Sequence, residues 1–186
     1  MRARTALAKA KAKVKTKPQA KPKPKTKAPA KPKPAGPEKR LKELGIVLPA
    51  VPTPLANYVP YAQVGKLVFL SGQGPRRADG TFYTGKVGTE VTVQDAYEHA
   101  RLVGLGLLAT LRAAAGSLDK IKRVVKLLGM VNDGPGFTDQ PKVINGCSDL
   151  MVEVFGERGR HARSAVGMSG LPANITVEIE AIFELV

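Results

Sequence analysis

The stretch ITVEIEAIFEL at residues 175–185 alternates between apolar side chains and a second, mostly polar set. A period of two residues predicts a β-strand with one buried face. That face must pack against another layer of structure, which helices elsewhere in the chain can supply. The opposite face carries acids together with Ile182 and Val186, so it is neither plainly solvent-exposed nor plainly core, and such a face often mediates self-association. The apolar set comprises Ile175, Val177, Ile179, Ala181, Phe183 and Leu185.

Two helices are predicted from their caps and their apolar spacing. Thr92 is a good N-cap, and Asp95 three residues later completes a capping box. Gly116 is the expected C-cap of this first helix. A second helix is predicted from residues 138–139 to Gly156. Apolar residues recur at helical spacing in the first helix at Ala96, Ala100, Val103, Leu107, Leu111 and Ala114, and in the second at Val143, Cys147, Leu150 and Val154.

Strand-like stretches surround these helices. Two strands are predicted within residues 59–75, joined near residues 64–66, and an interior strand over residues 121–131. A last pair of strands follows the second helix. The order strand, strand, helix, strand, helix, strand, strand predicts an α+β domain in which two helices cover one face of a mixed sheet.

Residues 1–40 differ from the rest of the chain in composition. They hold half of the 30 Lys and Arg residues but a single acid, Glu38, and they consist mostly of Lys, Ala and Pro. Such a segment buries too little apolar surface to offset its ordering entropy. We therefore expect a disordered basic tail over residues 1–40 and one compact domain over residues 41–186. A solubilising or tethering role is the favoured interpretation of the tail, and association with polyanions such as nucleic acid, without reading their sequence, is the alternative.

The single cysteine, Cys147, excludes an internal disulfide and fits a reducing compartment. It lies on the apolar stripe of the second helix, which favours a plain core cysteine over a nucleophile.

The N-terminus lacks the apolar core of a secretory signal, and the longest apolar run, residues 102–111, is about half a membrane span. We expect a cytoplasmic protein without membrane contact; targeting to an organelle by the basic tail is the alternative.

Several familiar functional motifs are absent or misplaced. The stretch GLGLLA at residues 104–109 has the spacing of a dinucleotide-binding fingerprint, but it lies in the middle of a helix rather than after a strand. Its glycines more simply permit close helix packing. His99 and His161 do not form metal-ligand spacing with Cys147, so the sequence predicts no metal site.

Arg163 and Glu178 are the remaining candidates for chemistry, because they stand on the two terminal strands. A guanidinium can grip a carboxylate at two points, and a nearby glutamate can take a proton from water and return it to a leaving amine. From spacing alone, a structural ion pair or a pair of solvated charges is the favoured interpretation, and an active site is the alternative.

Five segments follow one another along the domain: PYAQ (60–63), FLSGQGP (69–75), AAAGSLDKI (113–121), FGERGRHARSAVG (155–167) and LPANITVEIEAI (171–182). Together they resemble the successive motifs of the Rid family of reactive-intermediate deaminases. This YjgF-like group is also classified as endoribonuclease L-PSP or chorismate mutase-like. The resemblance covers most of residues 43–186 and leaves out the tail.

The resemblance implies a chorismate mutase-like fold that assembles as a homotrimer, with active sites in clefts between subunits. It also implies hydrolysis of 2-imino acids of the 2-aminoacrylate type to 2-oxo acids and ammonia. The family needs neither a metal nor an organic cofactor for this reaction.

The family's site residues carry over by motif. Arg163 matches the carboxylate-binding arginine, and Glu178 matches the water-positioning glutamate. Tyr61 matches a tyrosine that lines the pocket, and Gly72 matches a glycine whose backbone approaches the substrate. Ala165 stands where many members have Cys or Thr, at a position thought to act through its main-chain carbonyl.

Some features depart from the family pattern near the predicted pocket. The segment from Tyr61 to Ser71 is shorter than in typical members, and residues 129–148 are longer. Ser148 replaces a common asparagine and is a further candidate for substrate binding.

Two functions other than imine hydrolysis remain as alternatives. One is a non-catalytic ligand-binding or chaperone-like trimer, and the other is an RNA-acting protein that uses the basic tail.

Overall fold

The computed structural model describes residues 36–51 and 57–186 of the chain. The predicted disordered tail therefore lies outside the described residues as far as position 35. Across the described ranges, none of the helices is both long enough and apolar enough to cross a lipid bilayer.

The short helix α1 (Pro37–Glu43) begins ahead of the domain boundary that composition predicted at residue 41. Proline is tolerated in its first turn, where a backbone N–H would have no helical partner. Leu41 is buried in the core, and the Glu38 carboxylate accepts a hydrogen bond from the Leu118 amide at 2.9 Å. These contacts fold a segment that its charge had assigned to the tail.

Five strands form one mixed sheet in the order β1-β2-β5-β3-β4. Strands β3 and β4 run parallel, and the other neighbouring pairs are antiparallel. The prediction of a mixed sheet is thus confirmed. The strands are β1 (Tyr61–Val64), β2 (Leu67–Gln73), β3 (Ile121–Asn132), β4 (Ala162–Met168) and β5 (Val177–Leu185), and the short 3₁₀ turns are η1 (Leu118–Lys120), η2 (Gly156–Gly159) and η3 (Pro172–Asn174).

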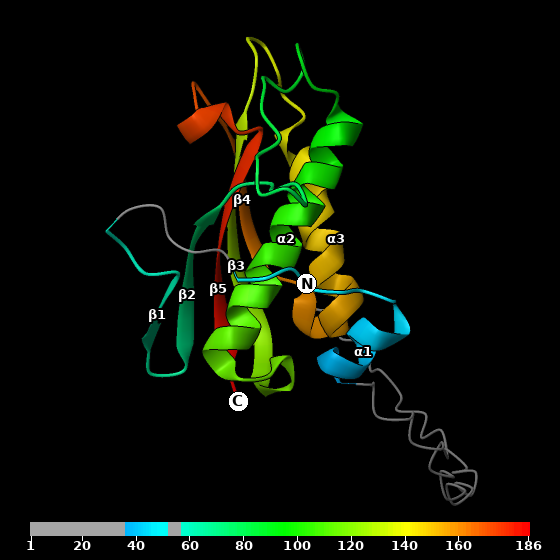
Figure 1. Ribbon diagram of the computed structural model, residues 1–186, viewed down its shortest axis with the longest axis vertical. Helices are drawn as coiled ribbons and strands as arrows, with labels where there is room; N and C mark the ends of the chain where they lie inside the picture. The colour runs from blue at the N-terminus through cyan, green and yellow to red at the C-terminus, as the bar shows by residue number, and fades with distance from the viewer. Residues whose placement is uncertain (1–35, 52–56) are drawn as a thin grey trace, which may run out of the picture. The chain divides into compact units, whose positions relative to one another are not determined.

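Two long helices, α2 (Val93–Ala115) and α3 (Gln140–Phe155), lie side by side against one face of this sheet (Figure 1). The alternation in β5 sets this arrangement, because four of its alternate side chains are buried in the core beneath the helices. These are Val177, Ile179, Ala181 and Phe183. The predicted α+β architecture is therefore confirmed.

The caps of α2 are those that the sequence predicted. Thr92 Oγ1 accepts from the Asp95 amide at 3.0 Å and donates to the Asp95 carboxylate at 2.7 Å. Gly116 ends the helix in the left-handed conformation, with φ of 78°. These local signals fix the ends of the helix independently of the sheet.

Glycines bring α2 and α3 into close contact. A β-carbon at Gly104 would lie 2.9 Å from Leu150 Cδ2, and one at Gly146 would overlap the carbonyl oxygen of Tyr97. The first of these glycines belongs to the GLGLLA stretch, so the expectation of close helix packing there is confirmed.

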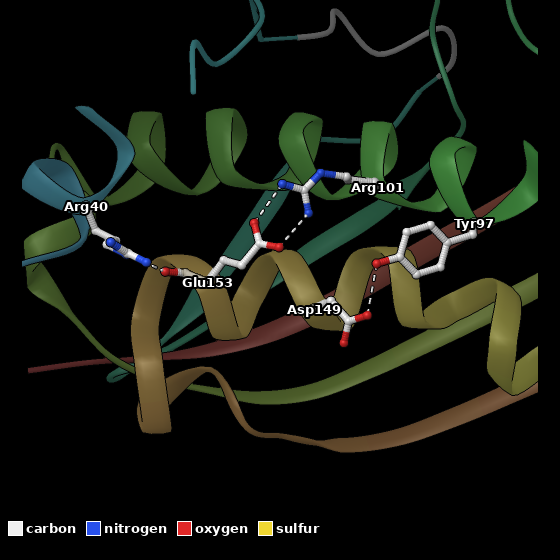
Figure 2. A network of polar contacts seen from close by, with 5 residues as sticks. All are labelled: Arg40, Tyr97, Arg101, Asp149 and Glu153. Atoms are coloured by element: carbon white, nitrogen blue, oxygen red, sulfur yellow. Dashed lines mark hydrogen bonds and ion pairs between the residues drawn. The ribbon is translucent and has the colours of Figure 1, made fainter. Parts of the chain in front are cut away.

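Polar contacts join the three helices on the side away from the sheet (Figure 2). Arg101 grips the Glu153 carboxylate at two points, with distances of 3.2 and 2.7 Å. Tyr97 donates to Asp149 at 2.9 Å, and Arg40 of α1 donates to the Glu153 carbonyl at 3.1 Å. The network fixes the register of α2 on α3 and attaches α1 to α3.

Candidate active site

Arg163 lies on the edge strand β4 and faces the helices. It pairs with Leu127 of β3, which is fully buried beneath them. Its Nη1 donates to Asn145 Oδ1 and to Ser148 Oγ, both at 2.9 Å, and its Nη2 donates to the Pro141 carbonyl at 3.3 Å. Helix α3 thus holds the guanidinium with three neutral acceptors.

This arrangement leaves one edge of the Arg163 guanidinium open. Nη1 makes two of these donations and Nη2 makes one, whereas no acceptor among the described residues takes the Nε proton. The Nε–Nη2 edge carries two parallel N–H groups, which is the fork that a carboxylate binds at two points. The positive charge of Arg163 meets no carboxylate among the described residues.

Ser148 is itself held by a histidine. Ser148 Oγ lies 3.0 Å from His161 Nε2, and His161 Nδ1 lies 2.6 Å from the Gly159 carbonyl. A carbonyl can only accept, so Nδ1 carries the proton and Nε2 accepts from the serine hydroxyl. Ser148, a predicted substrate-binding residue, therefore contacts Arg163 and His161.

Glu178 lies near the centre of the sheet, on β5. Its neighbours Val177 and Ile179 are buried beneath the helices, so its own side chain points to the opposite face. Burial raises the pKa of the Glu178 carboxyl, and the nearby Glu180 carboxylate raises it further. A carboxyl whose pKa is shifted toward neutrality is suited to both accepting and returning a proton.

Gly72 provides the space for that carboxylate. A β-carbon on Gly72 would overlap Glu178 Oε1. The register explains the approach: Leu70 pairs with Ala181 and Gln73 with Ile179, so two residues of β2 face one residue of β5. This bulge turns Gly72 toward the carboxylate, and the predicted pair of Gly72 and Glu178 is brought together.

Arg163 and Glu178, in contrast, lie on opposite faces of the sheet within one chain. Arg163 pairs with Leu127 of β3 and Glu178 with Met130, and positions three apart along a strand point to opposite faces. The structural ion pair that spacing favoured is therefore wrong within a single chain. The same geometry means that one chain does not by itself bring the predicted catalytic pair together.

Tyr61 and Ala165, the other two predicted site residues, lie at opposite edges of the sheet. Tyr61 begins β1, at the opposite edge of the sheet from β4, and packs against the core together with its partner Leu70. Ala165 lies beside Arg163 on β4, pairs with Gly129 and also packs against the core. The predicted residues thus form a group at β4 and α3, a group at β2 and β5, and Tyr61 alone.

His161 is a site residue that the sequence did not predict. It was considered only as a metal ligand and set aside. The available signal was its position two residues before Arg163, because extended residues i and i+2 point to the same side. Asn145 was missed as well, although it precedes Ser148 by three residues and so shares a helix face with it.

Cys147 takes no part in this site. Its side chain is fully buried, and burial raises the pKa of the thiol to about 12, with the charge of Arg163 acting in the opposite direction. A thiol in this state supplies no thiolate at neutral pH. The interpretation as a plain core cysteine fits the structure.

The sequence is similar to those of known proteins. A sequence model of the YjgF/chorismate mutase-like endoribonuclease family matches residues 38–185. The chain is 47% identical over 146 residues to protein TCP17 of Trypanosoma cruzi, covering 78% of this chain and 91% of that protein. It is 30% identical over 138 residues to a 2-iminobutanoate/2-iminopropanoate deaminase of Dermatophagoides farinae, covering 74% of this chain and 92% of that protein.

A solved structure shows the same architecture. Protein Atu1372 of Agrobacterium tumefaciens, described as having unknown function, aligns with a TM-score of 0.73 and 49% identity. The alignment covers 81% of this chain and 94% of that one. The expected similarity in sequence and fold is therefore confirmed.

Proposed function

Because the chain belongs to the YjgF/chorismate mutase-like family, we propose that it hydrolyses small 2-imino acids to 2-oxo acids and ammonia. The observation that carries the proposal is the Arg163 guanidinium, which three neutral acceptors hold in place while its Nε–Nη2 edge stays open. A fixed, uncompensated fork of this kind suits a small carboxylate. The relative from Dermatophagoides farinae, named as a deaminase of 2-imino acids, supports the same substrate class.

The active site of this proposal is completed by a second copy of the chain. Arg163 and Glu178 of one chain point away from each other, so a substrate between them needs one residue from each of two copies. The sheet face that carries Glu178 also exposes apolar side chains, with Phe69 38% and Val166 39% exposed. We propose that this face associates in a homotrimer, in which Arg163 of one copy approaches Glu178 of the next.

The reaction then divides between the two residues. Arg163 binds the substrate carboxylate and withdraws charge from the adjacent imine carbon. Glu178 takes a proton from water as the water oxygen bonds to the carbon of the protonated imine, the C=N π electrons move to nitrogen, and a neutral tetrahedral aminoalcohol forms. Glu178 gives this proton to the amine nitrogen, and the carbon–nitrogen bond then breaks as the carbonyl forms. The hydroxyl proton passes through Glu178 to solvent, and a 2-oxo acid and ammonia leave. The raised pKa of Glu178 makes its carboxylate a stronger base for the first proton transfer, from water.

The test is turnover of a freshly generated imino acid. An amino-acid oxidase produces 2-iminopropanoate in the cuvette, and trapping with semicarbazide reports how fast the imine disappears. Arg163→Ala and Arg163→Lys should each slow hydrolysis by about 100-fold or more, because two charged hydrogen bonds are lost or distorted. Arg160→Ala is the matched control, since among the described residues this exposed arginine forms an ion pair only with Glu157 in its own turn.

The outcomes separate the alternatives. Wild-type protein that gives no acceleration over the uncatalysed reaction would overturn the deaminase proposal. Binding of a 2-oxo acid without turnover would instead identify a ligand-binding module. Normal turnover by Arg163→Ala would remove the arginine from the mechanism.

A further inference from the structure

The side chains that accept hydrogen bonds from the Arg163 guanidinium must themselves be held in one orientation. Its Nη1 donates to Asn145 and Ser148, which stand about one turn apart on α3. The Asn145 side chain presents its oxygen as a fixed acceptor. A serine hydroxyl rotates freely, however, and it serves an arginine only when its proton points elsewhere.

His161 accepts the proton of the Ser148 hydroxyl and so fixes the direction in which it points. The Gly159 carbonyl takes the Nδ1 proton at 2.6 Å, which leaves Nε2 as an acceptor 3.0 Å from Ser148 Oγ. The single serine proton then points to His161, and the oxygen lone pairs face Nη1 of Arg163 at 2.9 Å. Four groups are thus ordered in one direction, from Arg163 through Ser148 and His161 to the Gly159 carbonyl.

We propose that His161 is a positioning residue for Arg163, acting through the hydroxyl of Ser148, and that it sharpens the recognition of carboxylate substrates. This inference rests on the proposed function. His161 does not contact the substrate in the proposed mechanism. It orients the Ser148 hydroxyl, and this hydroxyl in turn orients the Arg163 guanidinium. Ser148, whose only proton is already donated, acts as an acceptor for Arg163 rather than as a donor to the substrate.

The surroundings keep His161 in the required form. Burial lowers the pKa of His161, the Gly159 carbonyl acts in the opposite direction, and the charge of Arg163 lowers it further. The imidazole therefore stays neutral at neutral pH. A neutral ring with its proton on Nδ1 is the tautomer that can accept from Ser148.

Two substitutions at position 161 separate hydrogen bonding from packing. His161→Phe keeps a ring of similar size but removes the acceptor, whereas His161→Gln offers an amide oxygen in place of Nε2. Binding of pyruvate, a small 2-oxo acid, is measured by calorimetry, and KM and kcat are measured with 2-iminopropanoate. His161→Phe should weaken pyruvate binding by about 10-fold and raise KM more than it lowers kcat, because the lost orientation affects carboxylate binding first. His161→Gln should recover binding to within about 3-fold of the wild type.

A double-mutant cycle tests whether His161 acts through Ser148. Ser148→Ala should weaken pyruvate binding about as much as His161→Phe, and the double variant should bind no more weakly than either single variant. Arg160→Ala, next to His161 in the sequence, should bind like the wild type. Equal binding by wild type and His161→Phe, or full additivity of the two single effects, would overturn the inference.

The nitrogen-15 chemical shifts of the His161 ring test the inference without an activity measurement. Nitrogen-15 NMR of His161 should show a proton on Nδ1, and Ser148→Ala should shift the Nε2 resonance as its hydrogen bond is lost. If the wild type neither binds pyruvate nor hydrolyses the imine, the proposed function fails and carboxylate recognition by His161 fails with it. If binding is normal but Nε2 carries the proton, or does not respond to Ser148→Ala, the inference alone is overturned.

Discussion

The guanidinium of Arg163 and the carboxylate of Glu178 lie on opposite faces of one five-stranded sheet. Arg163 pairs with Leu127 on the helix side, and Glu178 pairs with Met130 on the other side. Strand geometry prevents either side chain from reaching through the sheet to the other. Chemistry that uses both residues therefore requires two copies of the chain.

Mixing two inactive variants should restore activity. Arg163→Ala lacks the carboxylate anchor and Glu178→Gln lacks the proton acceptor, so each alone should be inactive. When the two are unfolded and refolded together, mixed oligomers contain sites that combine an intact Arg163 with an intact Glu178. In a closed ring of three copies mixed at random, about one quarter of the sites would be intact. The measurement is the turnover of 2-iminopropanoate relative to refolded wild type.

The control for this experiment is each variant refolded alone. Activity in the mixture that is no higher than the mean of these two controls would contradict a shared site.

Gly72→Ala should remove most activity while the fold survives. The added methyl group would overlap Glu178 Oε1, so the flexible carboxylate must move away. A displacement of this kind should reduce kcat by about 10- to 100-fold, because proton transfer depends on position. Gly170→Ala is the control, since a β-carbon there meets nothing within 4 Å. Unchanged kcat in Gly72→Ala would show that the position of Glu178 is not critical.

Gly146→Ala should destabilise the protein even though alanine favours helices. The new β-carbon would overlap the Tyr97 carbonyl and lie 3.1 Å from the Arg101 amide, so α2 and α3 must separate. Overpacking of this kind costs about 1–3 kcal/mol. Replacing glycine by alanine in a helix gains about 1 kcal/mol from helix propensity, so the net change should be destabilising over most of that range. Urea unfolding at matched protein concentration measures the change, with Gly170→Ala again as the reference. Equal or greater stability of Gly146→Ala would show that the helix contact can relax.

Acid should destabilise the fold partly through His99. This buried ring stacks on Tyr83 at 4.1 Å and contacts Thr176 Oγ1 at 3.1 Å. Burial lowers the pKa of His99, Asp95 raises it, and Arg77 lowers it. The folded state therefore binds the proton less readily than the unfolded state does. The resulting stabilisation is present above about pH 6.5 and is lost as the pH falls through the lowered folded pKa.

The variant His99→Gln isolates this contribution. Between about pH 7 and about pH 5, its free energy of unfolding should fall less steeply than that of the wild type, by at most about 1.4 kcal/mol per pH unit. Urea unfolding at several pH values gives both slopes. His161 also has a lowered pKa, so the variant should keep a residual slope. Parallel slopes for the two proteins would rule out a role for His99.

The helices and strands could be predicted because their signals are local. Thr92 and Gly116 mark the ends of α2 through hydrogen bonds and a backbone conformation that need no distant partner. The start of the domain could not be predicted in the same way. Helix α1 is held by contacts of Glu38 and Leu41 with residues far along the chain, which composition does not reveal.

Patterns and motifs in the sequence predict the α+β architecture, the buried face of β5 and Arg163 with Glu178 as the candidate pair. A period of two or of 3.6 residues assigns each side chain to a face, and motifs name the residue types. They do not show which faces of these elements lie next to each other. The pairing of β3 with both β4 and β5 places Arg163 and Glu178 on opposite sides, and the packing of α3 on β4 brings Ser148 and His161 to the guanidinium. The physical reason is that register and packing are set by contacts between segments far apart in the chain, and no local pattern encodes them.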